Sequence, residues 1–327
     1  MYISAADKLY PQKTAVLLNP HGGRIRKRLA RIRDLATAIP GAIVYETESL
    51  ADMNRIIDEL AEPGVDHLVI VGGDGTVQAV LNRLFTGKPW SRLPLVSIVP
   101  GGTTNMTASD LGTSSNPEKC LQQLARCLMN DLDVRLVTRS VLQIRQDQQP
   151  DIHGMFFGTG LIARGSEYFH RHVKKSGLTG ESGSALVMLR MLTGLLTGRN
   201  AEERAPIRIR LTDDTGHTRE YNCMLMFTST LDRLLLGLRP YWGGGNGAIH
   251  TTCLREHPHR LWRSLLTIIC GRGNSLNENA GYYSRNNSAI DLLMDAGFIV
   301  DGEFFLCESR HGPLRISQAG PVRFLLP

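Results

Sequence analysis

The strongest constraint on the fold lies between His67 and Leu84, where an apolar run breaks into a glycine-rich turn. The run Leu68–Val71 predicts a buried parallel strand, and the apolar residues after the turn repeat at helical spacing. The turn Gly72–Thr76 reads GGDGT. Its glycines let a ligand approach the backbone, and the N-terminus of the following helix favours an anion there. The stretch therefore predicts a strand, a phosphate-binding turn and a helix.

Asp74 is the only charged residue of this turn. A carboxylate repels a phosphate unless a cation lies between them, so Asp74 indicates either bound Mg²⁺ or a hydrogen-bonding role inside the turn. We expect its side chain at the solvent edge, where it contributes little to the core. Two commoner glycine loops are excluded, because GxxxxGK[ST] is absent and GxGxxG fails at Gln78.

Two more polar turns follow predicted strands. Asn19–Gly23 (NPHGG) comes after the strand Thr14–Leu18, and Pro100–Asn105 (PGGTTN) comes after the strand Leu95–Val99. Strands and helices alternate here, which indicates the α/β class: a doubly wound, mainly parallel sheet with helices on both faces. Because the carboxyl ends of parallel strands share one edge, we expect all three turns to meet there. The other predicted elements are the strands Ala42–Tyr45 and His67–Val71 and the helices Leu50–Leu60 and Pro117–Asn130.

The pattern changes near Asp133, where we place a domain boundary. Beyond it, strand-like segments such as Ser140–Ile144, Ile207–Leu211 and Tyr221–Phe227 follow one another with little helix between them. We predict a nucleotide-binding domain over residues 1–133, which residues 315–327 could rejoin. Residues 134–314 then form a β-rich substrate domain, an antiparallel sandwich with a helical insert near 184–196.

A further polar turn follows the apolar run Phe298–Val300 and reads Asp301-Gly302-Glu303. Two carboxylates around a glycine at the end of a strand have the chemistry of a general base with a metal neighbour. Taken alone, this tripeptide is more often an ordinary turn. Its place at the end of an apolar strand makes it a candidate catalytic element as well.

GGDGT, NPHGG and PGGTTN resemble, in order, three motifs of the diacylglycerol kinase catalytic family. That family includes sphingosine kinases and bacterial lipid kinases and is distantly related to NAD kinases. The resemblance covers most of the chain and is strongest in the first 133 residues. It implies an ATP- and Mg²⁺-dependent lipid kinase with its active site in the cleft between the domains.

The resemblance also implies roles for individual residues. Asp301 matches the base of the family's DGE motif, and we predict Asp301, Glu303 and Asp74 as catalytic residues. The metal environment would comprise Glu303 with Asp74 or Asp133. The residues expected to bind the nucleotide are Asn19, Gly73, Asp74, Gly75, Thr76, Gly102, Thr103 and Asn105.

The chain departs from the family at several positions. Diacylglycerol kinases commonly read GTxND, but Met106 stands where the acid would be. If Met106 packs inward, as we favour, Met106→Asp would bury an unpaired charge at a cost of several kcal/mol. If the acid is simply unneeded, activity would stay unchanged or rise. The run Gly243–Gly247, which includes Asn246, replaces an acidic loop of bacterial members, so we do not predict a second metal. His21 and Gly22 also differ from the first motif.

Composition fits a globular protein of two domains. The 327 residues are 42% hydrophobic and 21% charged, and 37 Lys and Arg against 31 Asp and Glu give a net charge of +6. The six cysteines contain no CxxC pair, the N-terminus does not resemble a signal peptide, and no apolar run could span a bilayer. We therefore expect a cytoplasmic protein with reduced thiols, peripheral at the inner membrane face. Its partner would be a lipid substrate presented at a membrane surface, with no nucleic acid involved.

Some segments leave alternatives open. Basic residues dominate the helix after Gly23, and Arg24 and Arg26 could meet phosphates, although a solvated face is the plainer interpretation. Apolar residues near 184–196, beside the basic stretch Tyr168–Lys175, and the segment Arg255–Ile269 could contact a membrane, although core packing is favoured. The alternative functions are an NAD kinase-like enzyme and a non-catalytic lipid- or nucleotide-binding relative. A zinc site is disfavoured, because the nearest candidates match no compact template; they are His250, Cys253, His257 and His259.

Overall fold

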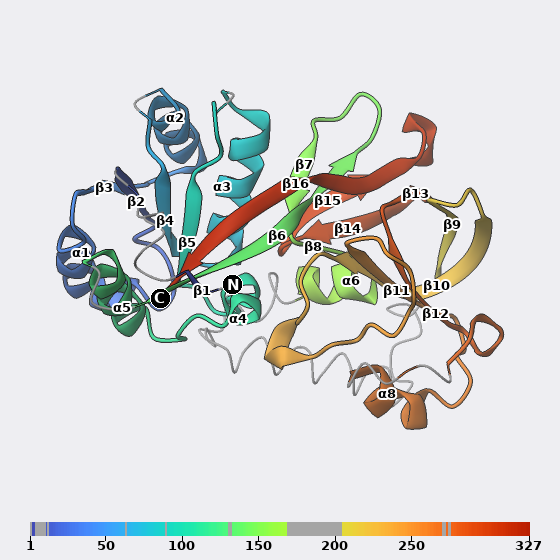
Figure 1. The fold of residues 1–327 in the computed structure, drawn as a ribbon. Helices are drawn as coiled ribbons and strands as arrows, with labels where there is room; N and C mark the ends of the chain where they lie inside the picture. Colours follow the sequence, from blue (N-terminus) through green and yellow to red (C-terminus); the bar gives the residue numbers. More distant parts are fainter. Residues whose placement is uncertain are drawn as a thin grey trace. The chain divides into compact units, whose positions relative to one another are not determined.

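The computed structural model describes residues 2–3, 11, 13–62, 64–88, 90–129, 133–168, 205–269, 273 and 276–327. The helical insert predicted near 184–196 and most of the basic stretch before it lie outside these residues. The chain divides into two compact units (Figure 1). The first comprises Met1–Arg139 with Pro321–Pro327, and the second comprises Ser140–Gly320. Strands β6 (Val134–Arg145) and β16 (Leu314–Leu326) contribute residues to both.

The first unit alternates strands and helices as its sequence predicts. Thr14–Leu18 and Leu50–Leu60 form a strand and a helix with the predicted bounds. The elements are β1 (Tyr2–Ile3), β2 (Thr14–Leu18), α1 (Leu29–Thr37), β3 (Ala42–Glu46), α2 (Leu50–Leu60), β4 (His67–Gly72), α3 (Asp74–Thr86), β5 (Leu95–Pro100), α4 (Met106–Leu111) and α5 (Pro117–Leu128).

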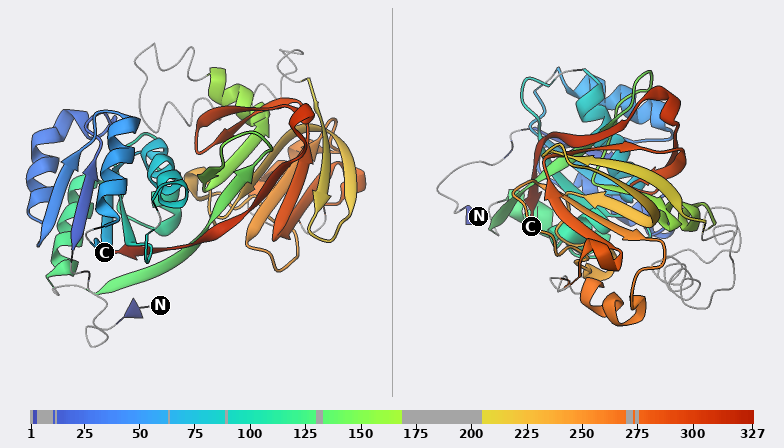
Figure 2. Two further views of the ribbon diagram at one scale, coloured as in Figure 1. Left: turned by 90° about the horizontal axis from the view of Figure 1, so that it is seen from above. Right: turned by 90° about the vertical axis from the view of Figure 1, so that its right-hand side faces the viewer.

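The sheet of this unit is parallel, in the order β16-β5-β4-β2-β3. Strands β2, β4 and β5 are buried over their whole length, as expected for a sheet covered on both faces. One face packs against α1 and α5 in a single apolar cluster. Helices α2 and α3 lie together on the other face (Figure 1, Figure 2) and are joined by Arg83 Nε donating to Asp58 Oδ1 over 2.9 Å.

A buried chain of polar side chains crosses this sheet at His67. Its Nδ1 lies 3.2 Å from Thr14 Oγ1, and its Nε2 lies 2.9 Å from Ser97 Oγ, which donates to the Leu325 carbonyl oxygen over 2.7 Å. Because Ser97 gives its proton to Leu325, the ring donates from Nε2 to Ser97 Oγ, and a neutral ring then accepts at Nδ1 from Thr14. Burial lowers the pKa of His67 to about 4. The chain ties β2, β4, β5 and β16 together.

His67 should make the fold sensitive to mild acid. The unfolded chain binds a proton at this ring below its ordinary pKa of 6.5, whereas the folded chain does so only near pH 4. The stability that His67 contributes is therefore present above pH 6.5 and is lost as the pH falls towards 4. Between pH 7 and pH 5 the parent should lose about 2 kcal/mol more than His67→Gln, as measured by denaturant unfolding. Equal losses in the two proteins would contradict this account.

The second unit consists mainly of antiparallel strands. Its elements are the later part of β6, β7 (Ile152–Gly154), β8 (Phe156–Gly160), α6 (Leu161–Tyr168), β9 (Ile207–Asp213), β10 (Thr218–Ser229), β11 (Ile249–Arg255), α8 (Leu261–Ile269), β12 (Tyr282–Asn287), β13 (Ala289–Leu293), β14 (Ala296–Val300), β15 (Glu303–Cys307) and the earlier part of β16. The order β15-β14-β8-β10-β9-β13-β16 is antiparallel throughout. The predicted class, a parallel α/β unit followed by antiparallel strands, is confirmed.

The core of the second unit is apolar and aromatic. The rings of Phe157 and Phe298 lie 5.2 Å apart and belong to one buried cluster, to which β6, β8, β9, β10, β11, β12, β13, β14, β15 and β16 contribute. Strand β10 is central, because it pairs with β8, β9 and β11, and β11 pairs in turn with β12. The core thus reaches the β14–β15 hairpin, which carries Asp301.

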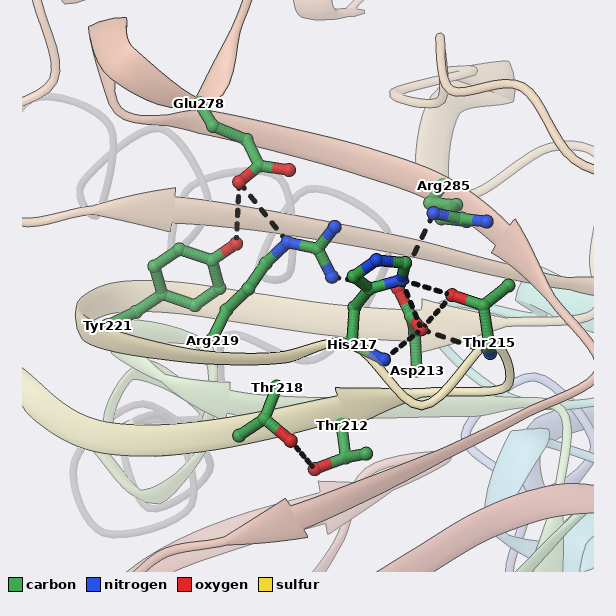
Figure 3. A network of polar contacts seen from close by, with 9 residues as sticks. All are labelled: Thr212, Asp213, Thr215, His217, Thr218, Arg219, Tyr221, Glu278 and Arg285. Atoms are coloured by element: carbon green, nitrogen blue, oxygen red, sulfur yellow. Dashed lines mark hydrogen bonds and ion pairs between the residues drawn. The ribbon is translucent and has the colours of Figure 1, made fainter.

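A polar network closes the β9–β10 hairpin around Asp213 (Figure 3). Its buried carboxylate accepts hydrogen bonds from the amide of His217, from Thr215 and from the guanidinium groups of Arg219 and Arg285. Burial alone would raise the pKa of Asp213, but the bonds from Thr215, Arg219 and the His217 amide outweigh it and lower the pKa to about 2. The network stabilises the end of the hairpin, because its hydrogen-bond donors and acceptors pair with one another.

Candidate functional site

Three glycine turns meet at the carboxyl ends of β2, β4 and β5, which are neighbours in the first sheet. Backbone hydrogen bonds join them: Gly101 N donates to Gly72 O over 2.7 Å, Arg24 N donates to Gly101 O over 3.0 Å, and Asn19 N donates to Val71 O over 3.0 Å. The three turns therefore form one edge of the sheet, as the order of the motifs predicts.

Glycine is required where the turns touch. A Cβ on Gly102 would lie 2.5 Å from the Cα of Gly73, and a Cβ on Gly73 would lie 2.9 Å from the Cα of Gly102. A Cβ on Gly22 would lie 2.9 Å from the Gly101 carbonyl oxygen. Side chains are thus excluded between the turns, so backbone groups line the edge.

The predicted asparagines hold the turns in place. The Asn19 amide donates to Thr76 Oγ1 over 2.9 Å, and its Oδ1 accepts from the His21 amide over 2.9 Å. Asn105, with a left-handed φ of 51°, exchanges two hydrogen bonds of 2.8 Å with the backbone of Gly102. These side chains hold the loops in shape around the edge.

Helix α3 begins inside the GGDGT turn, at Asp74. Its N-cap residue, Gly73, provides no side-chain hydrogen bond, and the first amides of a helix have no partner within the helix. Gly75 and Thr76 lie in this first turn, and Thr103 follows Gly102 on the adjoining loop. A helix of 13 residues starting at a backbone-lined edge is suited to binding a phosphate.

Asp74 is half-buried, so it lies only in part at the solvent edge where the sequence places it. Its Oδ1 accepts from Thr107 N over 3.3 Å. Burial raises the pKa of Asp74, while the amides of Met106, Thr107 and Asn105 oppose the rise. The carboxylate therefore links the turn after β4 to the start of α4, a contact between residues 33 positions apart.

Met106 is the first residue of α4, at the helix start that the sequence predicts, and is half-buried. A carboxylate at this position would be partly solvated, so the large cost expected for a buried charge does not apply. Its neighbour would be Asp74, whose carboxylate the Met106 amide already faces. The two negative charges would repel one another.

Met106→Asp should therefore lower stability by about 1 kcal/mol at neutral pH, and millimolar Mg²⁺ should recover most of that loss by bridging the two carboxylates. Thermal melting of the parent and the variant, with and without Mg²⁺, measures both effects. A variant that melts as the parent does in the absence of Mg²⁺ would contradict the proximity of the two groups.

In the second unit, Asp301 is buried to 7% exposure at the end of β14 and has a left-handed φ of 48°. Its carboxylate accepts the amides of Met155 over 2.8 Å and Phe156 over 2.9 Å, and its own amide donates to Phe156 O over 3.0 Å. A carboxylate held by two amides has one fixed orientation. This strained, fixed geometry is typical of functional positions.

Gly154 provides the space for this carboxylate. A Cβ there would lie 2.6 Å from Asp301 Oδ2 and 2.4 Å from a methyl group of Val300. Gly154 and the two amides after it were not predicted from the sequence. A signal was present, because a glycine at the end of a strand indicates close approach of another group.

The carboxylates predicted around a metal come from both units. Asp133 is exposed just before β6, and Glu303 is exposed at the start of β15, opposite Val300. Within the parts of the chain that the structure describes, no three His, Cys, Asp or Glu side chains form a group that could hold a metal ion. The predicted metal environment stays a prediction.

Two other predicted features have ordinary contacts. His250 Nδ1 lies 2.7 Å from Asn286 Oδ1, and Cys253 Sγ lies 3.0 Å from the buried Cys223 Sγ. The glycine run beginning at Gly243 lies against β12, where the Asn286 amide donates to the carbonyl oxygens of Gly243 and Gly245. In the first unit, Arg24 Nη1 donates to the Ser115 carbonyl oxygen over 2.8 Å.

Residues 13–137 match the sequence profile of the diacylglycerol kinase catalytic domain. The YegS-like probable lipid kinase of Enterobacter sp. (strain 638) is 30% identical over 115 residues, which are 35% of this chain and 37% of that protein. The diacylglycerol kinase of Bacillus subtilis (strain 168) is 30% identical over 104 residues, 31% of this chain and 33% of that protein. The alignments thus span about a third of these relatives' length.

The similarity to solved structures covers more of the chain than the sequence alignments do. The crystal structure of a diacylglycerol kinase from Bacillus anthracis superposes with a TM-score of 0.63 at 17% identity, covering 98% of both chains. Yeast NADH kinase complexed with NADH superposes with a TM-score of 0.50 at 11% identity, covering 100% of this chain and 89% of the other. At such identities the likeness establishes the fold alone. Residues 13–137 are thus similar to the diacylglycerol kinase catalytic domain, and the chain shares this similarity with proteins named as lipid kinases.

Proposed function

We propose that this protein is a lipid kinase that transfers the γ-phosphoryl group of ATP to a lipid hydroxyl, with Mg²⁺. The observation that carries the proposal is the edge built by the three glycine turns, where backbone amides and the start of α3 converge. Such an edge binds phosphate without a positively charged side chain. Related proteins named as lipid kinases share this domain.

The first unit has features that fit Mg²⁺ carried by a nucleotide. Mg²⁺ usually takes one or two carboxylates, substrate phosphates and several waters. Asp74 offers one carboxylate beside the turns, and the described residues contain no group that could hold a metal without a ligand's help. Asp133 and Glu303 are the other candidates. When bound, Mg²⁺ would neutralise charge on the phosphates.

The second unit would supply the base. Asp301 would take the proton of the lipid hydroxyl as that oxygen forms a bond to the γ-phosphorus. The bond from the γ-phosphorus to the β,γ-bridging oxygen breaks, and the products are a phosphorylated lipid and ADP. The two amides on Asp301 would hold its carboxylate in one orientation for this transfer.

The acceptor would be presented at a membrane surface, which for a cytoplasmic protein is the inner face. None of the helices in the described part of the chain is long and apolar enough to cross a bilayer. The acceptor hydroxyl would lie at the interface between headgroups and water.

Incubation with labelled ATP and Mg²⁺ tests the proposal. The acceptor panel is diacylglycerol, a sphingoid base, a ceramide and phosphatidylglycerol, with NAD as the acceptor that an NAD kinase would use. We expect a labelled lipid, and its identity names the substrate. Label in NAD alone would establish the other activity, and ATP binding without transfer to any acceptor would indicate a non-catalytic relative.

A further inference from the structure

The connection between β10 and β11 carries an apolar tip on the surface of the second unit. It reads Leu231-Asp232-Arg233-Leu234-Leu235-Leu236-Gly237-Leu238-Arg239-Pro240. Leu231 and Leu234 are buried, whereas Leu236 is 64% exposed. Leu235 and Leu238 on either side of it are half-buried. The tip therefore presents Leu236 to the solvent between two half-buried leucines.

The tip is held in a defined shape. Leu234 N donates to Leu238 O over 2.8 Å, and Gly237 N donates to Leu234 O over 2.9 Å. At the entrance, Leu231 N donates to Ser229 Oγ over 3.1 Å, and at the exit the Pro240 carbonyl oxygen accepts from a buried threonine of β11. Both ends are thus fixed to the sheet, so exposure of the tip is not the consequence of a loose loop.

The backbone at Leu236 is strained. Its φ of 60° and ψ of 20° lie in the left-handed region, which a branched side chain disfavours and glycine adopts readily. Gly237, with a φ of 74°, follows directly. Leucine at this position gains no burial in exchange for the strain, because most of its surface faces solvent. A strained, exposed leucine is therefore explained better by an external apolar partner than by folding.

Arginines flank the tip. Arg233 and Arg239 are exposed on either side of the leucines, and Asp232, at the base, is half-buried. An exposed apolar tip between guanidinium groups fits the interface of a bilayer that carries negative headgroups. Phosphates there can accept from the arginines while leucine enters the acyl region.

We propose that the tip Leu235–Leu236, with Arg233 and Arg239, docks the protein onto a bilayer with anionic headgroups. This proposal deepens the proposed function. It rests on that function for the premise that the protein contacts a bilayer. It assigns the membrane contact to this loop, whereas the sequence left such a contact open for residues near 184–196 and 255–269, where core packing was favoured. Binding to vesicles is measured without catalysis, so the two proposals can fail separately.

Co-sedimentation with vesicles tests the docking. We expect the parent to bind phosphatidylcholine vesicles containing phosphatidylglycerol and to bind pure phosphatidylcholine vesicles more weakly. Leu236→Ser should weaken binding to the anionic vesicles by about 10-fold or more, the effect of one buried leucine. The matched control is Leu50→Ser, because Leu50 is 60% exposed at the start of α2 in the other unit. Its binding should equal that of the parent.

Leu236→Gly tests whether the loss of vesicle binding in Leu236→Ser comes from misfolding. Glycine relieves the left-handed strain, so this variant should melt at or above the parental temperature while losing as much binding as Leu236→Ser. Arg239→Gln should remove most of the preference for anionic vesicles, whereas Arg31→Gln, at an exposed arginine of α1, should keep it.

Some outcomes would overturn the proposal. The first is that the parent binds neither kind of vesicle. The second is that Leu236→Gly binds as the parent does. The third is that Leu50→Ser weakens binding as much as Leu236→Ser does. Loss of binding in Leu306→Ser but not in Leu236→Ser would assign docking to β15, where Leu306 is 69% exposed. If transfer to a detergent-dispersed lipid also fails in the parent, the proposed function is refuted while the vesicle result stands.

Discussion

Asp301→Asn should lower the rate of phosphoryl transfer by about 10²-fold or more, because the amide cannot take the proton of the lipid hydroxyl. ATP binding should be unchanged. The variant should also lose roughly 1–3 kcal/mol of stability, because an amide cannot accept as a carboxylate does from both Met155 and Phe156. Single-turnover transfer, nucleotide binding and denaturant unfolding measure the three quantities.

Two further variants separate the base from the scaffold. Gly154→Ala keeps the carboxylate but forces it to move, since the added Cβ would lie 2.6 Å from Oδ2. Transfer should fall while nucleotide binding stays. Asp291→Asn, on β13 of the same unit, removes a carboxylate with no assigned role and should leave the rate unchanged. A rate for Asp301→Asn within a few-fold of the parent would move the base to another group, with Glu303 the first to examine.

Asp74→Ala should abolish transfer and also lower the stability of the first unit by about 1–2 kcal/mol. The loss of stability follows because the amide of Thr107, and those of Met106 and Asn105 beside it, would lose their carboxylate partner. Transfer assays and thermal melting of the same preparations measure both effects.

Asp74→Asn distinguishes the charge from the hydrogen bond. Its side-chain oxygen can still accept from Thr107, so the variant should melt close to the parent, yet without a negative charge it should remain inactive. A matched control is Asp110→Asn, since Asp110 lies at the other end of α4 and pairs with Arg139. An active Asp74→Asn protein would confine Asp74 to a structural role.

Much of the candidate site could be predicted because its cause is local. The apolar run at Leu68–Val71 and the glycines after it produce a strand and a turn within a few residues of chain. The convergence of three turns was also predictable, because parallel neighbours bring their carboxyl ends to one edge. The start of α4 at Met106 followed from the same kind of pattern.

The partners of the two main carboxylates could not be predicted in this way. Asp74 bonds to Thr107, 33 residues away, and Asp301 bonds to Met155 and Phe156, about 145 residues away. No periodicity in the chain encodes a backbone amide that arrives from another element. The contact of Asp74 with α4 was not predicted for this reason, since its partner is a backbone amide of that helix.

The sequence by itself determined the order of elements in the first unit, the glycine turns and the family of its catalytic domain, because these rest on short-range spacing and residue type. Only the tertiary structure decided which groups hold Asp74 and Asp301, that His67 must be neutral, and that Leu236 stands strained in solvent. Burial and long-range hydrogen bonding depend on what packs around a residue. These surroundings form only when distant segments pack together, so a local sequence pattern cannot predict them.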